Sequence, residues 1–299
     1  MPDSTKAASA ALAPDYASVW TRLSQPTRRT SVITRETSPG VLLRWFAVAF
    51  AVCFGLIWTY VATMPMAFLD RDYPLLVAKR TMLDECRLGT VAVFGDSRTL
   101  AATVPAVMPV TVSNFAMSGT SPIETYFNVQ RALRCPTLPK LVLIAHGALK
   151  FVSDSDYWVF DARMGFLSYA DMRAIDRDAT KMHDSEIVSY RPNDQLPLAL
   201  RELLFALRFP AFYFDSLVNG FVGLRLQHNL DAMHDALLSS GHALFGTAAG
   251  SSDIAAEGFG PNYRTSPLID LYFSRTLMLL ARHNVRVYFL SMPVNQATE

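Results

Sequence analysis

The chain has 299 residues, enough for one large domain or two small ones, and 51% of them are hydrophobic. A formal net charge of +1 and the lack of a basic face argue against a nucleic-acid partner. Three cysteines without a CxxC pair or a Cys/His cluster argue against a structural zinc site, and we expect no metal or other cofactor. The mean hydropathy of +0.20 is high for a purely soluble protein.

The N-terminal part of the chain predicts a tail followed by a membrane anchor. Residues 1–44 are rich in Ala, Ser, Thr and Pro and lack apolar periodicity, which is typical of a disordered tail. Residues 45–69 are uncharged and long enough to cross a bilayer core of about 30 Å. Trp45, Trp58 and Tyr60 lie where interfacial aromatic residues are found. The tail is too long for the usual start of a signal peptide, so we expect an uncleaved transmembrane helix.

Strands and helices alternate over residues 70–150, which predicts a mostly parallel sheet covered on both faces. The expected strands are short apolar runs that end in turns, and they lie at residues 90–94, 110–115 and 141–145. Helical sequence follows the first strand to about residue 107, and a second, amphipathic helix begins at Pro122.

The stretch TVAVFGDSRTL, residues 90–100, predicts a buried strand that delivers Ser97 at a tight turn before a helix. Such a turn lifts a nucleophile out of the sheet and directs helix N–H groups toward it. A plain turn with a helix cap is the alternative. Ligands bind beyond the carboxyl ends of parallel strands, where Ser97, Gly119 and His146 are all expected. Their convergence favours a functional site.

Two cysteines bear on the cellular compartment. Cys86 lies shortly before the first strand and Cys135 shortly before the third, so neighbouring strands in a 2-1-3 order would bring both thiols to the end opposite the site. A disulfide would place the domain in an oxidising compartment such as a periplasm, and two unrelated buried thiols are the alternative. Lysine and arginine do not decide the orientation, because four lie in residues 25–44 and four in residues 70–89. We expect a single-pass protein of the bacterial inner membrane with a periplasmic domain.

Three blocks in order and spacing, FGDSR, NFAMSGTSP and LVLIAHGA, resemble the SGNH/GDSL hydrolase superfamily. More closely, they resemble its membrane-anchored members from bacterial envelope and exopolysaccharide loci. The resemblance covers about residues 88–150 and extends to residues 266–299. It implies a flavodoxin-like, three-layer α/β sandwich with a mostly parallel sheet.

The resemblance also implies roles for individual residues. Ser97 matches the nucleophilic serine, and the N–H groups of Gly119 and Ser97 match an oxyanion hole, which stabilises the negative oxygen formed during acyl transfer. The neighbouring side chains expected to contact the substrate are those of Asp96, Arg98 and Ser118.

Two blocks depart from the family pattern. His146 stands where the third block carries an asparagine, and its imidazole N–H could donate to the oxyanion instead. The fourth block, a DxxH on a late loop, has no counterpart, since His283 alone is found there and precedes a strand. We therefore expect either a truncated chain or a degenerate member, because a serine without a base is a poor nucleophile near neutral pH.

Residues 151–265 form an insertion between the third strand and a last helix–strand unit, residues 266–299. Within it, residues 151–165 are aromatic and acidic, typical of a loop that lines a site, and residues 250–265 form a Gly-rich connection. Residues 196–246 have a helical pattern, which predicts a cap; an amphipathic surface on the bilayer or on a membrane protein is the alternative. Two sets of side chains invite a metal interpretation that the sequence does not support. The spacing of His228, His234 and His242 does not place them on one helical face. The stretch with Asp154, Asp156 and Asp161 lacks the Gly and the terminal Glu of a calcium loop.

Two functions follow as expectations. In the first, Ser97 attacks an acyl ester, most simply an acetyl ester of an envelope or exopolysaccharide, as an esterase or an O-acyltransferase. In the second, the chain is a non-catalytic SGNH-like scaffold that binds glycan or a membrane acyltransferase, or an inactive fragment of a longer enzyme. The expected partners are thus the membrane and a polysaccharide or acyl-ester substrate.

Overall fold

The structure is a computed structural model that describes residues 38–69, 72–154, 157, 160, 164–184, 187, 214, 216–243 and 263–290. Residues 1–37 of the tail expected over residues 1–44 lie outside the described residues, as do parts of the insertion, chiefly residues 188–213 and 244–262. The chain divides into two units, with the boundary between Val52 and Cys53.

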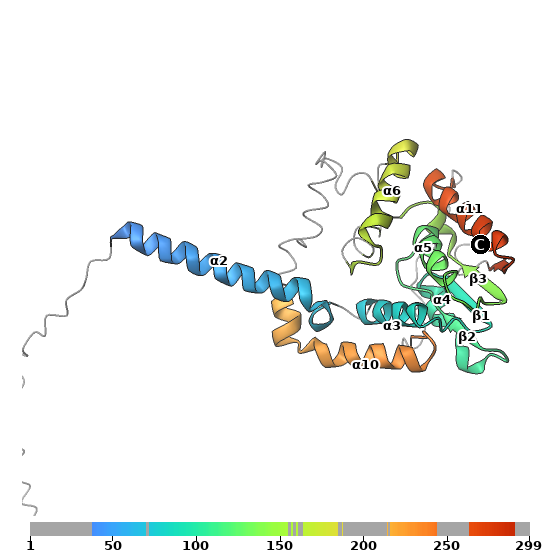
Figure 1. Cartoon of the computed structure of the whole chain (residues 1–299), viewed down its shortest axis with the longest axis horizontal. Helices are drawn as coiled ribbons and strands as arrows, with labels where there is room; N and C mark the ends of the chain where they lie inside the picture. The colour runs from blue at the N-terminus through green and yellow to red at the C-terminus, as the bar shows by residue number, and fades with distance from the viewer. Residues whose placement is uncertain are drawn as a thin grey trace, which may run out of the picture. The chain divides into compact units, whose positions relative to one another are not determined.

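Helix α2 (Pro39–Thr63) is, in the described part of the chain, the one helix long and apolar enough to cross a membrane (Figure 1). It begins before the expected residue 45 and ends before the expected residue 69. The early end has a clear cause, because Pro65 lacks an N–H and its ring clashes with a preceding carbonyl. Pro65 instead opens a short 3₁₀ turn, η1 (Pro65–Ala67).

Four parallel strands form the sheet, in the order β2-β1-β3-β4 (Figure 1). Their bounds are β1 (Val91–Gly95), β2 (Val112–Asn114), β3 (Leu141–Ala145) and β4 (Arg286–Phe289). The α/β class and the parallel sheet expected from the alternating pattern are therefore confirmed. Because the strands are parallel, the turns after β1, β2 and β3 lie at the same edge of the sheet.

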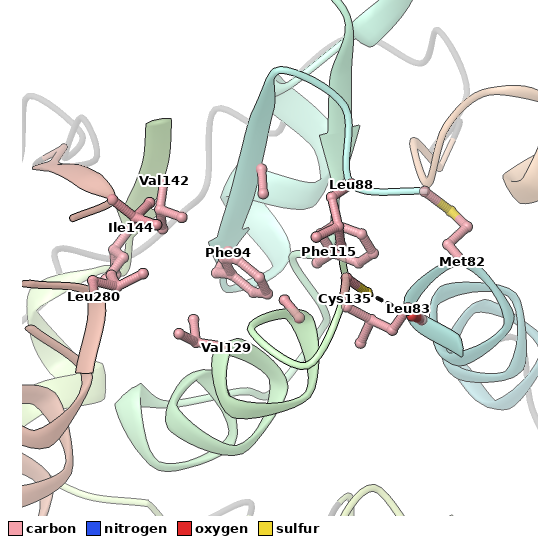
Figure 2. Close-up of a cluster of buried hydrophobic side chains, with 13 residues drawn as sticks. Met82, Leu83, Leu88, Phe94, Phe115, Val129, Cys135, Val142, Ile144 and Leu280 are labelled. Atoms are coloured by element: carbon pink, nitrogen blue, oxygen red, sulfur yellow. Dashed lines mark hydrogen bonds between the residues drawn. The ribbon is translucent and has the colours of Figure 1, made fainter. Parts of the chain in front are cut away.

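Helices α5 (Pro122–Ala132) and α11 (Pro267–Arg282) pack against each other and cover one face of the sheet. The core beneath them contains Phe94 and Phe115, whose rings stack with centroids 5.3 Å apart. Figure 2 shows this cluster, with Ile144 of β3 and Leu280 of α11 on one side of Phe94. Each buried side chain of this size contributes about 1.5–3 kcal/mol to folding. The opposite face carries a smaller cluster around Val91, Val93 and Val112.

The helix after β1 is shorter than expected. Helix α4 (Ser97–Ala102) ends well before residue 107, and a separate 3₁₀ turn, η2 (Pro105–Val107), follows. Pro105 explains the break, because a residue before proline is pushed out of the helical region, and Val104 is extended.

Helix α3 (Asp72–Asp84) packs along α10 (Arg225–Leu238) on the β2 side of the sheet (Figure 1). A disulfide joins Cys86, just after α3, to Cys135, just after α5, with their Cα atoms 5.5 Å apart. Both cysteines precede strands, so the bridge lies at the end of the sheet opposite the turns that follow the strands. The remaining elements are η3 (Ala148–Phe151), α6 (Tyr169–Met182) and the π-helical turn η5 (Val218–Val222).

Candidate functional site

The turn after β1 is held by Asp96, which caps α4. One carboxylate oxygen accepts the N–H groups of Arg98 at 3.0 Å and Thr99 at 3.5 Å, and the other accepts the Gly147 N–H at 2.6 Å. Asp96 therefore ties the turn after β1 to the turn after β3. The carboxylate is buried and accepts backbone N–H groups, so these contacts give it a structural role, and the predicted substrate contact stays a prediction.

Gly95 precedes this turn because no side chain fits there. A Cβ at this position would collide with the Ala145 carbonyl of the neighbouring strand and lie 2.6 Å from the Thr99 hydroxyl oxygen. The Thr99 hydroxyl in turn donates to the same Ala145 carbonyl at 2.6 Å. The glycine of the GDS block thus lets β1, β3 and α4 meet closely.

Ser97 is the first residue of α4 and is exposed. Within the described residues, its hydroxyl has no hydrogen bond to a histidine or a carboxylate, and its backbone N–H has no acceptor. Arg98 is half-buried, with its guanidinium carbon 3.3 Å from where a Cβ on Gly147 would lie. The structure therefore presents the serine to solvent beside a cation.

The turn after β2 lies against the end of β1. The Gly95 carbonyl accepts the Met117 N–H at 2.9 Å and the Thr120 hydroxyl at 2.8 Å. Gly119, between them, has a left-handed backbone with φ of +75°, which favours glycine. A Cβ there would also lie 2.5 Å from the Phe160 ring. Ser118 beside it is half-buried.

His146 follows β3 but is turned inward. Its side chain is 1% exposed, and its Nε2 lies 2.9 Å from the Thr125 hydroxyl on α5. Burial lowers the pKa of His146 to about 4, although the Asp96 carboxylate acts in the opposite direction, and the Lys150 cation lowers it further. The imidazole is therefore neutral at pH 7. Its Nδ1 is buried without a hydrogen bond in the described part of the chain.

An apolar cavity of about 540 Å³ borders His146. Its walls come from β4, α11 and the turn after β3, and include Phe151, Phe273 and Phe289. Phe151 lies edge-on to the His146 ring, with centroids 6.3 Å apart. His146 thus stands between the polar turns and an apolar wall.

The structure also shows where the His and Asp side chains lie that invited a metal interpretation in the sequence. Among the described residues, no group of three His, Cys, Asp or Glu side chains could hold a metal ion. His228 and His234 are exposed on α10, while His242 is buried with Nδ1 3.3 Å from the Leu100 carbonyl. Asp156 and Asp161 lie outside the described residues, whereas Asp154 is buried and accepts the Ser121 hydroxyl at 3.0 Å.

Three residues that shape the site were not found by sequence reasoning. Thr125 orients His146, and Lys150 donates to the Gly119 carbonyl at 3.1 Å. Lys79, buried on α3, donates to the Ala116 carbonyl in the turn before Gly119, and burial lowers its pKa. The local signal was weak, because each looks like an ordinary helix or loop residue until the elements are packed together.

His283 lies where the sequence placed it, after α11 and at the amino end of β4. That position is the edge of the sheet opposite Ser97.

Comparison of the chain with protein-family models, with curated proteins and with solved structures returned no match. The function must therefore be argued from the geometry and from the resemblance of the three blocks.

Proposed function

We propose that the chain is a membrane-anchored, SGNH/GDSL-like protein whose Ser97 acts on acyl esters, most simply acetyl esters of an envelope or exopolysaccharide. The observation that carries the proposal is the exposed Ser97 at the end of β1, with the Gly119 turn hydrogen-bonded to that same strand end. A flavodoxin-like sandwich is part of the proposal, and the order β2-β1-β3-β4 agrees with it.

The chemistry proceeds in two steps. The Ser97 Oγ forms a bond to the ester carbonyl carbon, and the N–H groups of Ser97 and Gly119 stabilise the negative oxygen. The sugar alcohol leaves with the proton that the Ser97 hydroxyl gives up, and the acyl group stays on Ser97. Water then accepts the acyl group in an esterase, or a second sugar hydroxyl accepts it in an O-acyltransferase, and in either case the proton of the acceptor hydroxyl returns to the Ser97 Oγ.

His146 is uncharged during the proposed reaction. Its low pKa keeps it from carrying charge near pH 7, and its Nε2 is already paired with Thr125. In the described part of the chain it makes no hydrogen bond to the Ser97 hydroxyl. We therefore assign it to shaping the wall of the site, and its part in the oxyanion hole stays a prediction.

Ser97→Ala tests the proposal in the full-length, detergent-solubilised protein. We expect acetate release from an acetylated polysaccharide, and labelling by a fluorophosphonate probe, to fall at least about 100-fold, since the nucleophile is lost. Ser168→Ala, at the exposed cap of α6, is the matched control and should keep full activity. Unchanged acetate release by Ser97→Ala would remove Ser97 from the reaction.

One observation favours a second function, a non-catalytic scaffold that binds glycan or a membrane acyltransferase. No described histidine or carboxylate contacts the Ser97 hydroxyl, so the usual means of activating a serine is not seen in this part of the chain. The scaffold function predicts no probe labelling of the wild-type chain together with retained glycan binding. The same labelling experiment therefore separates the two functions.

A further inference from the structure

A segment far along the chain packs against the end of the membrane helix. The Phe221 ring of η5 lies against Tyr60 of α2, with centroids 5.3 Å apart. A Cβ on Gly220 would collide with the Tyr60 hydroxyl, so the backbone of η5 runs directly over that residue.

Helix α10, which follows η5, is hydrogen-bonded to the segment just after the C-terminal end of α2. The buried Asn229 side chain donates to the carbonyls of Met66 and Leu69, both at 2.8 Å. Helix α10 then runs along α3 to the sheet, where the Ser240 carbonyl accepts the Asn114 N–H of β2 at 2.8 Å. The start of α10 is therefore at the anchor and its end is at the sheet.

The segment that leads from η5 into α10 exposes apolar side chains where a soluble surface would carry polar ones. The exposed fractions are 59% for Val218, 65% for Phe221, 79% for Val222 and 71% for Leu224. Residues 216–224 contain no charged side chain. Leu224 has a left-handed backbone with φ of +44°, which is unfavourable for leucine. We call residues 218–224 the apolar collar.

The depth of the collar follows from its contact with Tyr60. A helix of the length of α2 is slightly longer than a bilayer core of about 30 Å, so its C-terminal turn reaches the membrane interface. Tyrosine is enriched at that interface. Phe221 is in ring contact with Tyr60 and must lie at the same depth.

We propose that the apolar collar inserts into the interface of the bilayer leaflet from which α2 emerges, as an interfacial membrane contact beside the anchor. The occupant of this surface is lipid, at the boundary between headgroups and acyl chains. Arg225 directly follows the collar and is placed to meet lipid phosphates. The proposal rests on α2 crossing a bilayer and is independent of the chemistry of Ser97.

A double attachment of this kind has a mechanical consequence. A single helix followed by a turn would let the domain tilt freely, whereas the collar and α10 tie the sheet to the membrane surface through a second path.

Site-directed spin labelling tests the proposal in the full-length chain, reconstituted in phosphatidylcholine–phosphatidylglycerol vesicles. Cys53 is replaced by alanine and the Cys86–Cys135 disulfide is retained, so that one new cysteine is labelled at a time. The labelled variants are Val222→Cys and Leu224→Cys. Leu238→Cys is the matched control, because Leu238 is a similarly exposed leucine (72%) at the far end of α10.

We expect the ratio of collision with O₂ to collision with a water-soluble Ni(II) chelate to be at least about fivefold higher at residues 222 and 224 than at residue 238, since O₂ concentrates in lipid. Free access of the Ni(II) chelate to residues 222 and 224 would overturn the proposal. Exclusion of both reagents would also overturn it, and would mean that a protein covers the collar. Loss of Ser97 activity would leave this outcome unaffected, so the two proposals fail separately.

Discussion

At the scale of single residues, His146 shows how burial decides the state of a titratable group. The sequence placed it at the end of β3, where an imidazole N–H could reach an oxyanion. Packing turned it toward Thr125 and an apolar wall, and burial lowers its pKa to about 4. A charge on this ring is therefore unfavourable in the folded state.

This burial predicts a pH dependence of stability. The unfolded chain binds a proton on His146 near pH 6.5, whereas the folded chain binds it only near pH 4. The unfolded state therefore holds more protons between these values, so stability is fully present above pH 6.5 and is lost as the pH falls toward 4. The expected loss over the whole transition is about 3–4 kcal/mol, from a difference of about 2.5 pKa units at about 1.4 kcal/mol for each unit.

Urea unfolding of the detergent-solubilised chain between pH 7.5 and 4.5 measures this loss of stability. Because other groups also titrate in this range, the wild type is compared with His146→Asn, which cannot take up the proton. The wild type should lose more stability than the variant as the pH falls. Equal slopes for the two proteins would show that burial of His146 has no energetic cost.

At the scale of elements, the site edge is built from three turns that bond to one another. Asp96 joins the turn after β1 to that after β3, and the Gly95 carbonyl joins the end of β1 to the turn after β2. Few of these bonds lie within one element. The turns should therefore be ordered or lost together.

Asp96→Ala is expected to destabilise the chain by about 2–4 kcal/mol. The helix cap accounts for about 1 kcal/mol and the buried, unpaired Gly147 N–H for a further 1–3 kcal/mol. Urea unfolding at pH 7.5 measures the change, and Asp235→Ala, at an exposed position of α10, is the control with an expected effect below about 0.5 kcal/mol. A loss for Asp96→Ala no greater than for this control would mean that the turns are held without the carboxylate.

At the scale of the whole molecule, the disulfide and the membrane helix both bear on which side of the membrane the domain lies. The bridge closes a loop with a sequence separation of 49 residues, for which a constraint on the unfolded state of about 4 kcal/mol is expected. Such bridges persist in oxidising compartments. The structure shows the Cys86–Cys135 pairing that the sequence left open, whereas the side of the membrane on which the domain lies stays a prediction that the charges around α2 do not decide.

The orientation of the chain in the membrane can be determined from the redox state of its cysteines in living cells. With Cys53 replaced by alanine, the two remaining thiols should resist a maleimide–polyethylene glycol reagent until the cell extract is treated with a reductant. We expect no gel shift before reduction and a shift for two thiols after it, because a periplasmic domain is oxidised. A two-thiol shift before reduction would place the domain on the cytoplasmic side.

The sequence by itself determined the order of elements and the edge of the sheet at which the candidate site lies. Apolar runs ending in small residues located β1, β2 and β3 to within two residues, because a buried parallel strand requires such a run. Proline had a stronger local effect than the apolar pattern, and it ended α2 and α4 earlier than expected.

Only the tertiary structure decided what the side chains of the site do. The contacts of Asp96, His146, Lys79 and Thr125 join elements far apart in the chain, so no local pattern could reveal them. The apolar collar was likewise visible in the sequence only as a helical stretch. Its contact with Tyr60 depends on a return of the chain across more than 150 residues, which packing and not propensity brings about.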